Sequence, residues 1–155
     1  MKKITTILCM TAMALTLTAC GGSKETDITV DTAKLADELL TTVTSDTLTE
    51  TPADMIPSIY FIDADAMENS AAYASSGTTA CEVAVIQSKS KDSTADVEKQ
   101  FKNRVESQSS LYASYNQGEV EKLDKALIKS AGAYTVLCVC DDVDKANDIL
   151  KSYGF

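Results

Sequence analysis

The sequence predicts an α+β domain in which two β-hairpins form an antiparallel four-stranded sheet that packs against helices on one face. Two strongly apolar stretches, each joined to a neighbouring stretch through a short turn that contains glycine, indicate the hairpins. Segments with helical spacing of apolar residues precede, separate and follow these hairpins. This order of elements is typical of a layered α+β fold with an antiparallel sheet.

The N-terminal part of the domain is expected to contribute two helices. Apolar residues recur with helical spacing over residues 31–44, and Asp31 stands where an N-cap belongs. Residues 44–51 are rich in Thr, Ser and Asp and predict a loop. A second helix is expected to begin near Pro52, and Pro57 limits it to one or two turns.

The first hairpin is predicted from residues 70–75 and 80–87, which flank the turn Ser76-Gly77-Thr78-Thr79. The second of these strands is apolar on both faces apart from Glu82. A strand of this kind is typical of the middle of a sheet, so we expect it to be central.

The longest helix is expected over residues 92–115, with a buried stripe that ends at Tyr112 and Tyr115, and a shorter helix over 119–126. Residues 127–129 and 134–140 flank Ala131-Gly132 and predict the second hairpin.

The last helix is expected to run to about Ser152, with Asp141 or Asp142 as its cap. We interpret Asp141, Asp142 and Asp144 as first-turn residues that the helix dipole favours, in preference to cation ligands.

Residues 1–19 have the layout of a secretory signal peptide, with Lys2 and Lys3 followed by the uncharged, largely apolar residues 4–18. This stretch is shorter than the roughly 20 apolar residues that a membrane-spanning helix needs. Residues 17–21, Leu-Thr-Ala-Cys-Gly, resemble the lipobox of bacterial lipoproteins. The resemblance implies cleavage before Cys20 and attachment of acyl chains such as palmitate to that cysteine.

Residues 20–30 are small and polar and predict a flexible tether, which leaves residues 31–155 as a single α+β domain. Loss of Lys2 and Lys3 with the signal changes the net charge from −9 to −11. A surface this acidic argues against nucleic-acid partners, which bind basic patches. We therefore expect the partners to be the membrane, through the lipid on Cys20, and an envelope protein or wall component.

The chain has no histidine, which excludes Ser-His-Asp and Cys-His catalysis and the commonest general acid and base. Apart from Cys9 and Cys20, three cysteines remain: Cys81, Cys138 and Cys140. They are interpreted as buried thiols, a disulfide from Cys81 to either partner, or ligands of a soft metal. Their spacing matches no strong metal signature, so no metal and no cofactor is predicted.

Glu82 is a lone carboxylate in an apolar strand, and a buried charge has to be paired or neutralised. Arg104 and Gln108 stand four residues apart at the edge of the long helix's apolar stripe, and Tyr115 lies near the expected end of that helix. One hypothesis is a structural ion pair between Glu82 and Arg104. The other is a polar cluster of Glu82, Arg104, Gln108 and Tyr115 at the base of a ligand pocket.

From Leu39 to Phe155 the chain resembles a family of small bacterial lipoproteins known only as a domain of unknown function. The matching parts are the strand of residues 80–85, the helix that carries Arg104, Gln108 and Tyr115, and the closing hairpin. The resemblance implies an envelope location and a shared fold, and it carries no known activity.

These observations predict a lipid-anchored protein on the extracytoplasmic face of the cell membrane that acts as a non-catalytic binding or assembly module. A small-ligand receptor or accessory subunit, with its pocket near Glu82 and Arg104, is the alternative hypothesis. A third is an envelope enzyme that uses carboxylate, tyrosine or thiolate chemistry.

Overall fold

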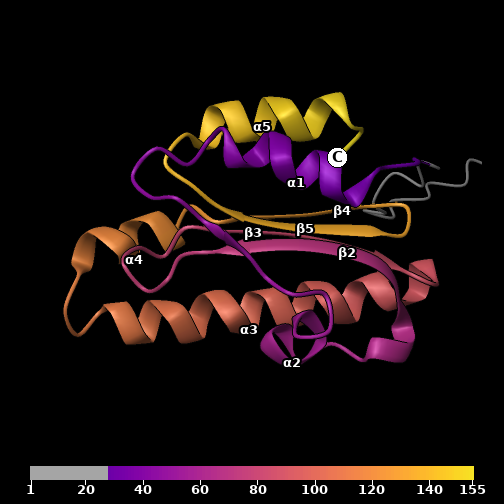
Figure 1. Ribbon diagram of the computed structural model, residues 1–155, viewed down its shortest axis with the longest axis horizontal. Coiled ribbons are helices and arrows are strands. Elements are labelled where there is room, and N and C mark those ends of the chain that lie inside the picture. Colours follow the sequence, from indigo (N-terminus) through magenta and orange to yellow (C-terminus); the bar gives the residue numbers. More distant parts are fainter. Residues whose placement is uncertain (1–27) are drawn as a thin grey trace, which may run out of the picture.

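The computed structural model describes residues 28–155, which form a layer of strands between two layers of helices (Figure 1). The helices are α1 (Thr32–Leu40), α2 (Ile56–Tyr60), α3 (Thr94–Tyr112), α4 (Gln117–Leu123) and α5 (Val143–Ser152), with short 3-10 turns at Ala64–Ala66 and Lys91–Ser93. The strands are β1 (Thr49–Glu50), β2 (Met67–Ala74), β3 (Glu82–Ser88), β4 (Leu127–Ala131) and β5 (Tyr134–Val139). All five strands pair antiparallel, in the order β1-β2-β3-β5-β4.

Both predicted hairpins are confirmed. Strand β2 pairs with β3 up to the rung Ala74↔Glu82, and β4 pairs with β5 up to Ala131↔Tyr134. Gly132 occupies the second hairpin's turn with φ +57°, a left-handed conformation that glycine adopts without steric cost. Strands β3 and β5 lie next to each other, so β3 is central, as its two-sided apolar pattern predicts.

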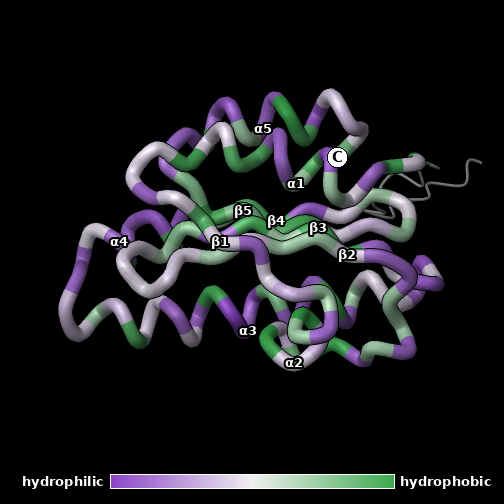
Figure 2. The backbone as a smooth tube through the Cα atoms, viewed as in Figure 1, coloured by the Kyte–Doolittle hydropathy of each residue, from purple (hydrophilic) through white to green (hydrophobic). Residues whose placement is uncertain are grey.

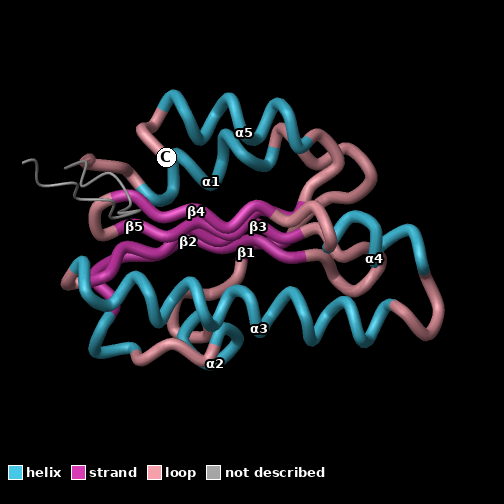
Figure 3. Tube along the Cα trace, turned by 180° about the vertical axis from the view of Figure 1, so that it is seen from behind, coloured by secondary structure: helices cyan, strands magenta, loops and turns pink. Residues whose placement is uncertain are grey.

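Helices cover both faces of the sheet, so the expectation of helices on one face is wrong. Helices α1 and α5 lie on one side, and α2 and α3 lie on the other (Figure 3). The physical reason is that every residue of β5, and every residue of β3 except Gln87, is buried. Figure 2 shows these hydrophobic strands between the two helical layers. One apolar core therefore centres on Phe101 of α3, and the other centres on Leu35 of α1.

The sheet has five strands, although the sequence predicts four. Strand β1 falls in the stretch expected to be a loop, and it has only two exposed, polar residues. Backbone pairing creates it: Thr49 lies opposite Ala74, and the Thr51 N–H donates to the Ala72 carbonyl at 2.8 Å. Because the strand buries no side chain, it leaves no apolar pattern in the sequence.

Helix α3 ends at Tyr112, three residues earlier than expected. The Asn116 N–H donates to the Tyr112 carbonyl at 2.8 Å, which closes a turn after the helix. The Tyr115 side chain is consequently 61% exposed and lies outside the buried stripe.

The end of the expected tether belongs to the domain. Val30 is buried in the α1 core and Ile28 packs against it, because both apolar side chains reach the space beside α1. The signal peptide, Cys20 and the rest of the tether lie outside the described residues. Within residues 28–155, no helix has the length and apolar character that crossing a membrane requires.

Candidate functional site

Glu82 and Arg104 form an ion pair inside the face that α3 covers. The Arg104 Nε lies 3.3 and 3.2 Å from the two carboxylate oxygens of Glu82, and its guanidinium NH2 nitrogen lies 3.2 Å from Oε1. The Tyr60 hydroxyl also donates to Oε1 at 2.7 Å. Glu82 as a residue is 3% exposed, so strand β3, helix α3 and helix α2 each contribute one member of a buried polar cluster.

The Tyr60 hydroxyl keeps its proton in this environment. Burial raises the pKa of Tyr60 well above its usual value, and the negative charge of Glu82 raises it further. The Arg104 guanidinium carbon also lies 5.9 Å from the centre of the Tyr60 ring, a cation–π arrangement. The carboxylate is therefore compensated by one cation and one neutral donor, which is what burial of a charge requires.

Gln108 lies near this pair, but Tyr115 does not. Glu82, Arg104, Gln108 and Tyr112 line a small cavity of about 60 Å³. Tyr115 follows the end of α3, where its ring lies 5.1 Å from that of Tyr112. The structure thus brings together three of the four residues that the sequence places in one polar cluster.

A second polar cluster surrounds Lys122 at the end of the sheet where β3 begins and β5 ends. The Lys122 Nζ lies 2.9 Å from Asp141 Oδ1, 3.3 Å from Glu119 Oε2, 3.1 Å from Ser45 Oγ and 3.3 Å from Cys81 Sγ. Although burial disfavours the charge, the hydrogen bonds with Asp141 and Cys81 raise the pKa of Lys122 above its ordinary value. These contacts favour the protonated ammonium form of Lys122.

Hydrogen bonds to Asp141 hold the loop after α1 next to this cluster. The Asp141 Oδ2 accepts the backbone N–H groups of Thr44 at 2.6 Å and Ser45 at 2.8 Å. Burial opposes its charge, but the Lys122 ammonium and these N–H groups hold the pKa of Asp141 well below its usual range. Asp142 caps α5 by accepting the Lys145 N–H at 3.0 Å, so Asp141 has a different role from the first-turn role expected for it.

Sequence reasoning missed the Lys122 cluster because its members come from distant segments. Ser45, Cys81, Lys122 and Asp141 are spread over almost one hundred residues and share no motif. The only local signal is Lys122 in the last turn of a short helix, which by itself indicates a solvated side chain. Tyr60 was likewise missed as a partner of Glu82.

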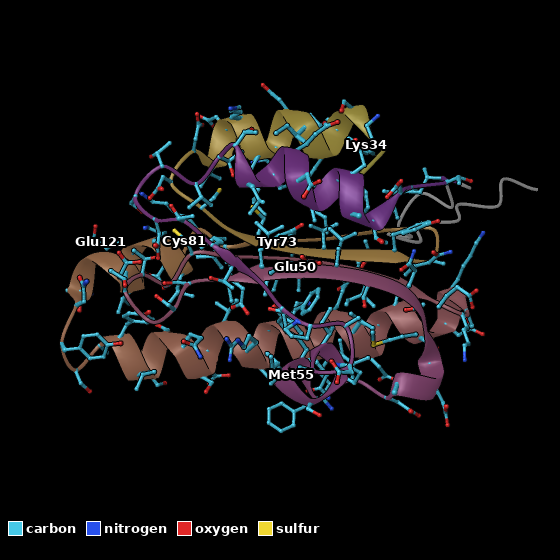
Figure 4. All side chains as sticks on the ribbon, in the orientation of Figure 1. Lys34, Glu50, Met55, Tyr73, Cys81 and Glu121 are labelled. Carbon is cyan, nitrogen blue, oxygen red and sulfur yellow. The ribbon has the colours of Figure 1, made fainter. Side chains whose placement is uncertain are left out.

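Cys81, Cys138 and Cys140 are free thiols, and all three are buried. Cys138 and Cys140 lie in the core that α1 and α5 cover. Figure 4 shows Cys81 at the end of the sheet beside α4. No three His, Cys, Asp or Glu side chains within residues 28–155 are grouped so as to hold a metal ion.

Among the large apolar side chains of the described residues, Phe61 is the most exposed. Phe61 is 81% exposed and follows α2 with φ +54°, a left-handed conformation that it alone adopts among the non-glycine residues in the described range. Two hollows of about 400 and 390 Å³ flank its ring, and Gln100 of α3 lines both. Met55, at the start of α2, is 51% exposed.

Comparison with known proteins gives one family. Residues 42–140 match the model of DUF4358, a domain of unknown function. No curated protein and no solved structure matches the chain.

Proposed function

The chain belongs to the DUF4358 family, and we propose that it is a lipid-anchored extracytoplasmic module that binds another envelope protein through Phe61. The exposed aromatic ring between two hollows carries the binding half of this proposal. The sequence of residues 1–20 supports its location.

Phe61 has the features of an interface anchor. A left-handed backbone costs an L-residue about 1–2 kcal/mol, and an exposed phenylalanine recovers none of this by burial in the free protein. Phe61 is the C-cap of α2, and its N–H donates to the Pro57 carbonyl, which offsets part of this cost. Aromatic side chains that enter a partner's pocket supply much of the binding energy at protein interfaces. Phe61 therefore fits a partner that covers its ring and fills the two hollows beside it.

The charges around Phe61 indicate the chemistry of that partner. Asp63 and Asp96 line one of the hollows, together with Ile62 and Val97. The charged residue that lines the other hollow, Arg104, is already paired with Glu82. The chain as a whole carries a net charge of −9. We expect the partner to present an apolar side chain flanked by Lys or Arg, because opposite charges favour encounter and register.

The proposed location is supported by the basic residues, the uncharged stretch and the lipobox-like residues 17–21 that precede the domain. Two or three acyl chains anchor a protein stably, since each buried methylene contributes about 0.8 kcal/mol and one chain gives only marginal binding. The acidic domain then stands off the anionic membrane surface, which repels it.

A small-ligand receptor has weaker support. The cavity that Glu82 and Arg104 both line measures about 60 Å³, whereas pockets for drug-sized ligands measure about 300–1,000 Å³. Arg104 also lines the hollow of about 400 Å³ beside Phe61, but Glu82 does not. The Glu82 carboxylate also already accepts from Tyr60 and Arg104. An enzyme has weaker support, because the contact of Lys122 with the Cys81 thiol is one of four polar contacts of that ammonium, which a structural cluster explains.

Site-specific photocross-linking in intact cells tests the binding half. Benzoylphenylalanine replaces Phe61 in one strain and Lys34 in the control strain. Lys34 is exposed on α1, on the opposite side of the sheet from α2 (Figure 4). We expect one adduct of defined mass from position 61 alone, and a weaker adduct when Asp63 and Asp96 are both replaced by asparagine. No adduct at position 61, or the same adducts at both positions, would contradict the proposal.

Metabolic labelling with an alkyne analogue of palmitate tests the location separately. Cys20→Ala is expected to abolish labelling and release the protein from the membrane fraction, because Cys20 is the expected acylation site. Cys9→Ala is the matched control and is expected to leave both unchanged. Labelling that persists in Cys20→Ala would refute acylation at Cys20. It would not bear on the proposal that Phe61 binds a partner.

A further inference from the structure

The register of the two central strands, if continued by one residue, brings Cys81 opposite Cys140. Glu82 lies opposite Val139, and Val83 lies opposite Cys138. Cys81 immediately precedes β3 and Cys140 immediately follows β5, so the next rung beyond Glu82↔Val139 joins these two cysteines. On a pleated sheet both side chains of a rung point to the same face. For this rung it is the face that carries Cys138, which lies two residues before Cys140.

Hydrogen bonds on both sides of β3 identify the type of this rung. The Cys81 carbonyl accepts from the Ser75 N–H, so Cys81 directs its backbone groups away from β5. At the other end of β3, the Ser88 N–H donates to Ala133, toward β5. Odd-numbered residues of β3 therefore hydrogen-bond toward β2, and even-numbered residues hydrogen-bond toward β5. Cys81 is odd-numbered, so it would face Cys140 as a non-hydrogen-bonded pair. Such pairs have Cα atoms about 4.5 Å apart, within the disulfide range of about 4.4–6.8 Å.

The other two pairings of the three cysteines do not fit a disulfide. Cys138 is the diagonal neighbour of Cys81, at about 7–8 Å, beyond the limit of about 7 Å for bridging without backbone movement. Cys138 and Cys140 stand two residues apart on one extended chain, which separates their Cβ atoms by about 6.6 Å, although their thiol groups interact. A disulfide needs Cβ atoms about 3.5–4.5 Å apart.

We propose that Cys81 and Cys140 are a disulfide-forming pair, oxidised by a thiol-specific oxidant of the disulfide class, with Cys138 left as a free thiol. The Cys140 thiolate attacks one sulfur of the oxidant's disulfide and displaces a thiolate. The Cys81 thiolate then attacks the Cys140 sulfur and displaces the second thiolate. One S–S bond breaks and one forms, the two cysteine protons pass to the departing thiolates, and the two electrons that the protein loses reduce the oxidant to two thiols.

The surroundings of both cysteines suit this reaction. Once β3 and β5 have paired, a hydrogen bond with Cys138 lowers the pKa of Cys140, which favours Cys140 as the attacking thiolate. Cys81 would exchange its contact with Lys122 for the bond to Cys140. Lys122 would keep Asp141, Glu119 and Ser45 as partners. Because both thiols are buried, the bond is expected to form while the chain folds. Only the presence of an oxidising compartment rests on the proposed function.

Refolding the purified full-length protein in a glutathione redox buffer tests the pairing. The protein is unfolded with reductant in urea, refolded with reduced and oxidised glutathione, trapped with an alkylating reagent and examined by mass spectrometry. No Lys or Arg separates Cys138 from Cys140, so both lie on one tryptic peptide and serine variants are needed to separate them. The full chain also contains Cys9 and Cys20, so the thiols are counted by peptide at positions 81, 138 and 140. At these positions we expect wild type and Cys138→Ser to lose two free thiols and to give a linked peptide, whereas Cys81→Ser and Cys140→Ser lose none.

Fully reduced Cys81, Cys138 and Cys140 in the refolded wild type, or a disulfide among these positions that persists in Cys140→Ser, would overturn the proposal. Fragmentation of the linked wild-type peptide between Cys138 and Cys140 identifies the bonded sulfur without relying on any variant to fold. The same trapping on intact cells reports on the compartment. A protein that is reduced in cells but oxidises in the glutathione buffer would count against the extracytoplasmic location and support the pairing.

Discussion

Replacing Arg104 by methionine removes the only cation within residues 28–155 that is seen to contact the buried Glu82 carboxylate, and it keeps most of the side-chain length. In the variant, Oε1 still accepts from Tyr60, but the Oε2 atom loses its Arg104 donor. Removing one partner of a buried ion pair costs about 3–5 kcal/mol. The Arg104 side chain is 26% exposed, and partial access to water reduces that penalty. We therefore expect Arg104→Met to lower the free energy of unfolding by about 2–3 kcal/mol, because water reaches one side of the pair.

Urea unfolding followed by far-ultraviolet circular dichroism measures this loss, since the chain has no tryptophan to report it by fluorescence. Lys102→Met is the matched control on the same helix. Lys102 makes an exposed i,i+4 pair with Glu98, and its loss is expected to cost at most about 0.5 kcal/mol. The double variant Glu82→Gln, Arg104→Met is expected to recover much of the stability, because it leaves no buried charge. Equal losses of unfolding free energy in Arg104→Met and Lys102→Met would refute the conclusion that the buried Glu82 carboxylate needs Arg104 as its counter-ion.

Three further predictions concern Asp141, Phe61 and Phe101. The folded-state pKa of Asp141 lies below its unfolded value of about 3.9, so its contribution to stability is full above that pH and is lost as the pH falls. In urea titrations, Asp141→Asn should therefore lower the free energy of unfolding by about 1–3 kcal/mol at pH 7 and by progressively less below pH 4. A loss that does not change with pH would contradict the stabilising role of the ionised Asp141 carboxylate. The free energy of unfolding of Phe61→Gly should exceed that of Phe61→Ala by about 1 kcal/mol, because glycine adopts the left-handed backbone without steric cost. A higher melting temperature for the alanine variant would show that this backbone is not strained. Phe101→Ala should cost about 3–5 kcal/mol because Phe101 is fully buried, whereas the same change at the exposed Phe61 should cost less than about 1 kcal/mol; similar melting temperatures for the two would disprove the two-core description.

Much of the Glu82 site was accessible from the sequence, because a lone carboxylate in an apolar strand demands a partner. Arg104, at the edge of the apolar stripe of α3, was the cation within reach, and the structure pairs the two. Tyr115 was assigned wrongly because the sequence does not mark the end of α3 at Tyr112. Tyr60 was missed because its hydroxyl reaches Glu82 through tertiary packing, which no local spacing encodes.

The sequence by itself determined the elements whose apolar residues recur with a fixed period. Both hairpins, the five helices and the central position of β3 follow from side chains that have to be buried, and burial leaves a pattern along the chain. The two-sided apolar character of β3 also contained the signal for helices on both faces, since each apolar face of a sheet needs a covering layer.

Tertiary structure alone decided the features that depend on backbone pairing or on contacts between distant segments. Strand β1 forms because its backbone pairs with β2. Its polar, exposed side chains give no sequence pattern that would predict this strand. Lys122 meets Asp141 and Ser45 only where the sheet ends. The choice of Cys140 over Cys138 as the partner of Cys81 depends on strand register, because a shift of one residue would move each side chain to the opposite face.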